Sequence, residues 1–136
     1  MSPICRVLSM SMLLAAGLVP HGHAATLLSS EDADRIVSLR NVTTDKDGAV
    51  SGEVVNHSKQ MLRDVRLQIL YSWRWNNEFR PGKDDPGMAA YPTIDQEIRP
   101  GGSARFSHAP STPLPARADG YFETSVKVVG FTEVFR

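Results

Sequence analysis

Regular alternation of apolar and polar side chains over residues 65–75 constrains the fold more than any other feature of the sequence. Every second position is apolar, namely Val65, Leu67, Ile69, Tyr71, Trp73 and Trp75. Four of the five positions between them are polar: Arg66, Gln68, Ser72 and Arg74, with Leu70 as the exception. Because successive side chains of a strand point to opposite faces, this pattern predicts a strand with one face on a core and the other in solvent. Such a strand is typical of an antiparallel sheet, since strands of parallel sheets are covered on both faces.

Turn chemistry divides the rest of the chain into further short strands. Residues 36–43 and 50–55 flank Asp45-Lys46-Asp47-Gly48, and Asp-Gly favours the tight turn of an antiparallel hairpin. Residues 93–98 and 103–108 flank a second turn at residues 99–102, and residues 121–134 form the last expected strand after a proline-containing bridge. Six or seven antiparallel strands in one domain predict an all-β, two-sheet immunoglobulin-like sandwich over residues 36–136. A small closed barrel is the alternative architecture.

The first residues read as a targeting segment. Residues 7–19 form an uncharged apolar run that is too short to span a bilayer comfortably, and Pro20 and small residues follow it. We therefore expect a secretory signal peptide over residues 1–24, with an uncut membrane anchor as the alternative. Residues 25–35 then form an N-terminal arm, in which Ser29 and Asp32 favour one helical turn unless the arm is frayed.

Cysteine usage narrows the compartment. The only cysteine, Cys5, precedes the apolar run and would leave with the signal peptide. Small extracellular domains usually depend on disulfides, so a mature chain without one must rely on a conventional core. We therefore expect a periplasmic or secreted protein, with the bacterial periplasm favoured.

Several motifs resemble a known family. Gly52-Glu53-Val54-Val55-Asn56, then residues 62–71 (LRDVRLQILY), and later Pro100-Gly101-Gly102 with Phe106 are similar to the FxLYD-type family of bacterial immunoglobulin-like domains. The resemblance covers residues 36–134 but departs at Gln68 and Ser72, where the family has Phe and Asp. It implies an exported β-sandwich and carries no functional residues.

The sequence lacks the residue patterns of the common catalytic and metal sites. Ser103 begins like a nucleophile elbow without its closing glycine, and Asp45 begins like a calcium loop without the later ligands. The 15 Lys and Arg residues balance the 15 Asp and Glu residues, which disfavours general binding to nucleic acid or anionic membranes. We therefore expect no enzyme activity, no cofactor, no metal, no nucleic acid and, after signal cleavage, no membrane.

Residues 76–92 are the strongest candidate for function. The segment is longer than a hairpin requires and mixes aromatic and charged residues, a composition typical of partner-binding surfaces. We predict a non-catalytic protein-binding or accessory module whose partner is a periplasmic or envelope protein. Its predicted contact residues are Trp75, Phe79, Arg80, Lys83, Asp84, Asp85 and Tyr91. A flexible surface excursion is the plainer interpretation of the segment.

The alternative function is small-ligand binding. A carbohydrate could stack on Trp75, Phe79 and Tyr91. Copper could bind His57 with Met61, or His108 with Met88. Burial of the tryptophans in the core argues against the sugar platform, although Trp75 could still lie at the rim of the core.

Overall fold

The computed structural model describes residues 30–135, which form one short helix and seven strands. The predicted signal peptide, residues 1–24, and the first residues of the arm lie outside this range. The helix α1 (Ser30–Ile36) has Glu31 and Asp32 in its first turn and Arg35 in its last turn, charges that complement the helix dipole. The described part of the predicted arm, from Ser30, is therefore helical. No helix in residues 30–135 is long and apolar enough to cross a bilayer.

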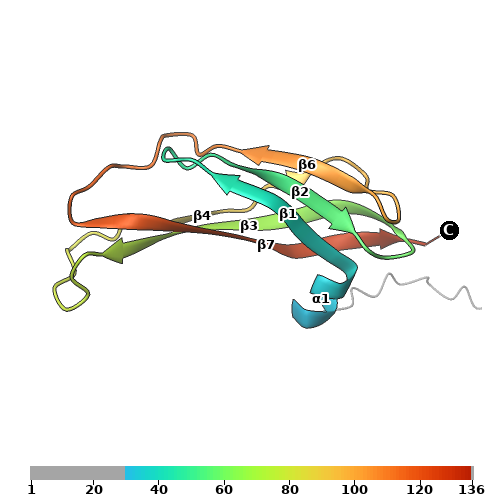
Figure 1. Cartoon of the computed structure of the whole chain (residues 1–136), viewed down its shortest axis with the longest axis horizontal. Helices are drawn as coiled ribbons and strands as arrows, with labels where there is room; N and C mark the ends of the chain where they lie inside the picture. Colours follow the sequence, from blue (N-terminus) through green and yellow to red (C-terminus); the bar gives the residue numbers. More distant parts are fainter. Residues whose placement is uncertain (1–29, 136) are drawn as a thin grey trace, which may run out of the picture.

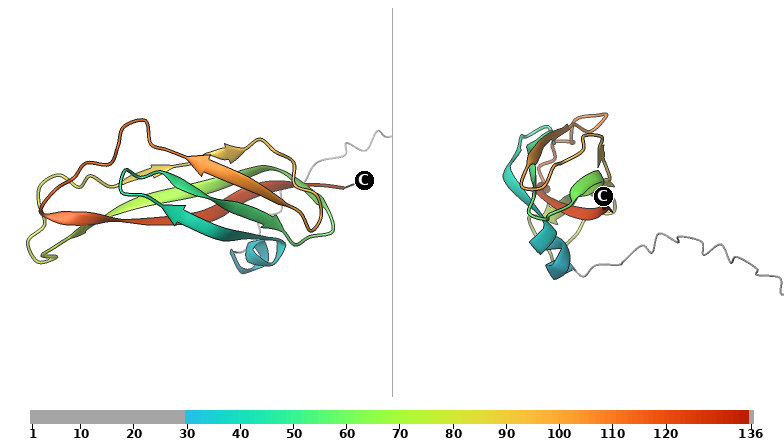
Figure 2. Two further views of the ribbon diagram at one scale, coloured as in Figure 1. Left: turned by 45° about the horizontal axis from the view of Figure 1, so that its top comes forward. Right: turned by 90° about the vertical axis from the view of Figure 1, so that its right-hand side faces the viewer.

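The strands form two antiparallel sheets that face each other as layers (Figure 1 and Figure 2). The first sheet contains β1 (Val37–Thr44), β2 (Val50–Asn56) and β6 (Ser103–His108), in the order β1-β2-β6. In the second sheet the central strand is β3 (Met61–Trp75). It pairs along one edge with β7 (Gly120–Val134), and along the other with β4 (Met88–Ala90) and β5 (Thr93–Ile94). The predicted all-β sandwich is confirmed.

The core lies on the alternating stripe of β3. Val65, Leu67, Ile69 and Tyr71 are at most 1% exposed, and Trp73 is 7% exposed. The first sheet supplies the facing residues, which include Val37, Val50, Val54, Ala104 and Phe106. The sequence pattern therefore identified the buried face of the longest central strand.

The central strand begins at Met61, four residues earlier than the predicted stripe, and two other strands differ more from the prediction. Residues 93–98 do not form one strand, because only Thr93–Ile94 pairs with β3 and Ile98 makes an isolated bridge to Leu62. The turn that follows, closed by a 2.8 Å hydrogen bond from Gly102 N to Arg99 O, carries the chain to β6 in the other sheet. The three-residue strand β4 was not predicted, because three residues are too few to display a period of two.

Candidate protein-binding loop

Residues 76–87 connect β3 to β4 at the end of the molecule where β3 ends and β7 begins (Figure 1). At this end β3 and β7 extend beyond the first sheet, so a different segment must cover their inner face (Figure 1). Residues 109–119 take this place, with Leu114 packed against the core and Arg117 against Trp73. The candidate loop is therefore built on an extension of the sandwich, held by the chain that precedes β7.

Trp73, Trp75 and Arg117 form the base of the loop. The two indole rings meet edge to face, with centroids 5.9 Å apart, and Trp73 packs in the same way on Phe122. The guanidinium carbon of Arg117 lies 5.1 Å from the centroid of Trp73 and 5.3 Å from that of Trp75. Both distances fall within cation–π range, so one cation holds two aromatic rings.

Arg117 also joins the loop to the segment before β7 through hydrogen bonds. Its Nε and Nη2 donate to the two carboxylate oxygens of Asp119 at 3.0 and 2.6 Å, and its Nη1 donates to the carbonyl of Asp84 at 3.0 Å. The hydrogen bond with Asp119 raises the pKa of Arg117, and the same bond lowers the pKa of Asp119 below its ordinary value of 3.8. Both groups are therefore held in their charged forms.

Further backbone contacts order the loop. Asn76 donates from its backbone N to Asp119 O at 3.0 Å and from Nδ2 to Ala118 O at 2.9 Å. The loop backbone packs so closely on Trp75 that a Cβ added to Gly82 would lie 2.8 Å from the indole ring. Asp85 Oδ1 accepts a 2.8 Å hydrogen bond from Gly87 N just before β4. The loop is therefore attached at both ends and in the middle.

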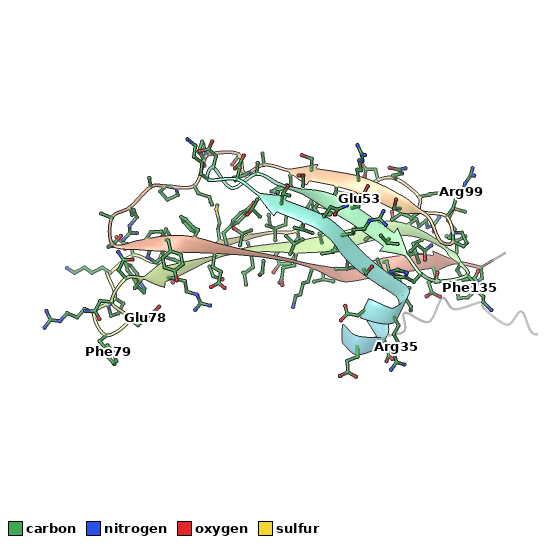
Figure 3. All side chains as sticks on the ribbon, viewed as in Figure 1. Arg35, Glu53, Glu78, Phe79, Arg99 and Phe135 are labelled. Carbon is green, nitrogen blue, oxygen red and sulfur yellow. The ribbon has the colours of Figure 1, made fainter. Side chains whose placement is uncertain are left out.

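The tip of the loop presents an aromatic side chain to solvent. Phe79 is 97% exposed, although Asn77 fixes its backbone by accepting hydrogen bonds from Phe79 N and Arg80 N. Figure 3 shows Phe79 and Glu78 at the extreme end of the molecule, directed away from both sheets. Arg80 and Lys83 are also exposed. An ordered tip thus carries a large apolar group between charged residues of both signs.

The structure separates the predicted contact residues into three groups. Phe79, Arg80 and Lys83 are exposed on the loop. Trp75 is half-buried at the base of the loop, beside Arg117, and Arg117 also donates a hydrogen bond to the backbone carbonyl of Asp84. Tyr91 lies beyond β4 on the outer face of the second sheet, where Gln68 Nε2 donates to its hydroxyl at 3.0 Å and Arg66 stacks on its ring at 5.4 Å. Phe79 is too exposed to pack against Trp75 or Tyr91, so these three rings do not form one platform.

Sequence reasoning missed Arg117, Asp119 and Gly82. Arg117 is a single cation in a proline-containing bridge, and no motif marks its partners. Only the pairing of β3 with β7, which places Gly120 beside Trp75, brings residues so distant in the sequence together. The available signal was Trp75 itself, since an indole at the end of a core stripe needs a cover from elsewhere.

The residues considered for metal or nucleophile chemistry have other partners. His57 Nε2 lies 2.6 Å from Ser38 Oγ at the protein surface. Asp45 Oδ1 accepts hydrogen bonds from Asp47 N and Ala49 N, both at 2.9 Å, as expected for a turn. Ser103 is exposed at the start of β6. Among residues 30–135, no three His, Cys, Asp or Glu side chains gather where they could hold a metal ion.

An open groove of about 230 Å³ lies between β5 and β6. Leu67 and Phe106 contribute apolar surface to it, and Asp95, Arg105 and His108 add polar groups. A second open groove, of about 470 Å³, is lined mainly by polar residues: Met61, Gln96, Glu97, Arg99, Gly102 and Ser103. Ligand pockets are usually roughly 300–1,000 Å³, are mostly apolar and enclose most of their ligand, whereas both of these grooves are open. The two open grooves therefore offer weaker support for small-ligand binding than the exposed tip offers for protein binding.

The fold and the loop define an antiparallel β-sandwich with an ordered aromatic tip at one end. Neither a protein family, nor a curated protein, nor a solved structure matches the chain. The resemblance to the FxLYD-type family therefore remains a prediction.

Proposed function

We propose that this protein is a non-catalytic binding module, exported to the periplasm or secreted, that attaches to a partner protein through residues 76–87. The observation that carries the proposal is the 97% exposure of Phe79 on a loop held by Arg117, Asn76 and Gly82. Exposed aromatic side chains with adjacent arginines are typical anchors of protein interfaces, because burial of the ring in a partner pocket yields most of the binding free energy.

Order in the loop strengthens this proposal. A loop that is already fixed loses little conformational entropy when it binds, so more of the contact energy appears as affinity. Glu78 and Arg80 flank Phe79 in the sequence and Lys83 follows on the same loop, and these exposed charges of both signs suit a polar rim that sets orientation. The expected partner therefore presents an apolar pocket with charged groups at its margin.

Site-specific photocrosslinking in living cells tests the proposal. A photoreactive phenylalanine analogue at position 79 is expected to capture a reproducible partner. The same analogue at position 135 provides a matched control, since Phe135 is also highly exposed but lies at the opposite end of the molecule (Figure 3). Once the partner is identified, its copurification without crosslinking should be lost in Phe79→Ala and retained in Phe135→Ala. Absence of any reproducible product at position 79, or equal capture at both positions, would refute the proposal.

Export is tested separately. We expect the protein from its natural host to begin at residue 25 or 26, which amino-terminal sequencing of the purified protein determines. A chain that retains residue 1 and sediments with membranes would instead indicate the uncut anchor.

A further inference from the structure

The outer edge of β7 is a long strand edge without a described partner. Within residues 30–135, β7 pairs only with β3, and β3 occupies one of its two edges (Figure 1). The strand is 15 residues long and contains no proline, and its charged side chains are Glu123, Lys127 and Glu133. Natural proteins usually protect edges with prolines, several charges or short strands, because an open edge pairs readily with another strand. Between Gly120 and Gly130, β7 therefore has no proline and only two charges, which are of opposite sign.

The core is also incompletely covered along this edge. Phe122, Val126, Val128 and Phe131 belong to the inner face of β7, but each is only partly buried. On the neighbouring strand β3, the corresponding inner side chains are almost fully buried. Another strand placed beside β7 would therefore cover apolar surface as well as satisfy backbone groups.

The sequence of β7 is complementary to itself in one antiparallel register. When two copies of the strand pair about a two-fold axis at Ser125, Glu123 of each copy lies opposite Lys127 of the other. Tyr121 then lies opposite Val129, and all four of these side chains are exposed on the outer face. Opposite charges and aromatic–β-branched pairs are both favourable as directly opposed cross-strand neighbours.

Neighbouring two-fold registers lack this match. A centre at Glu123 or at Lys127 places like charges opposite each other, and a centre at Thr124 or Val126 places Glu123 opposite Ser125 or Val129. Registers in between would oppose inner and outer side chains, which a sheet with one buried face does not allow. Lys127 forms no ion pair with any described residue. Glu123 Oε2 accepts a 2.7 Å hydrogen bond from Arg74 Nε, but the side chain keeps 58% exposure, so its other carboxylate oxygen can face Lys127 of a second copy.

We propose that two copies of this chain pair through β7, antiparallel and centred on Ser125, to form one continuous sheet across a homodimer. The paired stretch covers residues 120–130 of both copies. At each of its two ends, Gly120 of one copy lies opposite Gly130 of the other. Because the strands are antiparallel, the two loops that carry Phe79 lie at opposite ends of the dimer. The dimer thus presents two separate binding tips, an arrangement that permits bivalent attachment.

Disulfide trapping at the symmetry centre tests the register. In a Cys5→Ala background, Ser125→Cys places two thiols directly opposite each other, at about 4.5–5.5 Å between Cα atoms, which a disulfide can bridge. We expect rapid oxidation to a covalent dimer. Thr132→Cys, exposed on the same strand but beyond the paired stretch, is the matched control and should oxidise slowly.

Charge exchange provides a second test that requires no cysteine. Sedimentation velocity of the protein as its host produces it should show a dimer that forms between low micromolar and submillimolar concentration. Lys127→Glu places like charges opposite Glu123 twice in each dimer and should weaken association about tenfold. The double variant Glu123→Lys, Lys127→Glu should restore the association. Lys59→Glu, at an exposed lysine in the turn between β2 and β3, should leave the association unchanged.

Circular dichroism of each variant establishes whether it is folded. If a cysteine variant does not fold, the charge variants decide the outcome. The proposal is overturned if the protein stays monomeric throughout the concentration range, or if Lys127→Glu and Lys59→Glu associate equally well. It is likewise overturned if Thr132→Cys oxidises as fast as Ser125→Cys. Loss of partner capture by Phe79→Ala with an intact dimer would separate this inference from the proposed function.

Discussion

The side-chain amide of Asn56 donates a 3.0 Å hydrogen bond to the carbonyl oxygen of Ile98, 42 residues further along the chain. The same Nδ2 also lies within hydrogen-bond distance of Gln60 O and Arg99 O, while Oδ1 accepts from Ser58 N and Ser58 Oγ. Asn56 is 0% exposed. One buried amide therefore connects the turn before β3 to the crossing between the two sheets, which explains why a polar residue lies at the end of β2.

Substitution of Asn56 should be strongly destabilising. We expect Asn56→Ala to lower the free energy of unfolding by about 2–4 kcal/mol, because it leaves several buried polar groups without a partner. Urea denaturation followed by circular dichroism measures the change. Asn77→Ala, at an exposed asparagine in the loop, should cost less than about 1 kcal/mol. Equal losses for the two variants would contradict the role assigned to Asn56.

The hydroxyl of Tyr71 connects the core to the first hairpin. It donates a buried 2.7 Å hydrogen bond to Gly48 O, in a turn where Gly48 has a φ of 96°. We expect Tyr71→Phe to lower the free energy of unfolding by about 1–2 kcal/mol at neutral pH. Tyr121→Phe, at an exposed tyrosine, should have almost no effect on that free energy. Thermal or urea unfolding of both variants provides the comparison.

The same tyrosine should contribute to alkaline unfolding. Burial, and secondarily the charge of Asp45, raises the pKa of Tyr71 above its ordinary value of 10.0. A raised folded-state pKa means that the unfolded chain releases the proton first, so the contribution is complete below pH 10.0 and is lost as the pH rises through the folded value. We expect Tyr71→Phe to flatten the decline in stability above pH 10. An identical decline in both proteins would contradict the assignment.

The sequence predicted the sandwich better than the loop, and the reason is the range of the interactions. The stripe from Val65 to Trp73 is readable because alternation is local, and the Asp-Gly turn at Gly48 is readable because turn geometry is local. The base of the loop depends on Arg117, which reaches Trp75 only after β3 and β7 have paired. Exposure of Phe79 is equally non-local, since an aromatic residue in a loop can be covered by any segment of the chain.

Acid should release the base of the loop. The hydrogen bond from Arg117 lowers the pKa of Asp119, so the stabilisation it provides is present above pH 3.8 and is lost as the pH falls through the folded-state value. The two tryptophans of the chain both lie at this base, so their fluorescence reports on this end of the sandwich. We expect a fluorescence change below pH 3.8 that Asp119→Asn abolishes and Asp47→Asn retains. A transition unaffected by Asp119→Asn would show that another group is responsible.

Gly82 offers a way to displace the loop without touching its exposed tip. A Cβ at this position would meet the ring of Trp75 at 2.8 Å, and that ring also contacts Trp73 and Arg117, so the backbone of the loop must move. We expect Gly82→Ala to accelerate amide hydrogen exchange in residues 76–87 and to reduce partner capture at Phe79, with a loss of about 1 kcal/mol or less in global stability. Gly130→Ala is the matched control, because a Cβ there meets no atom within 4 Å. Unchanged exchange and unchanged capture in Gly82→Ala would mean that the order of the loop does not depend on its contact with Trp75.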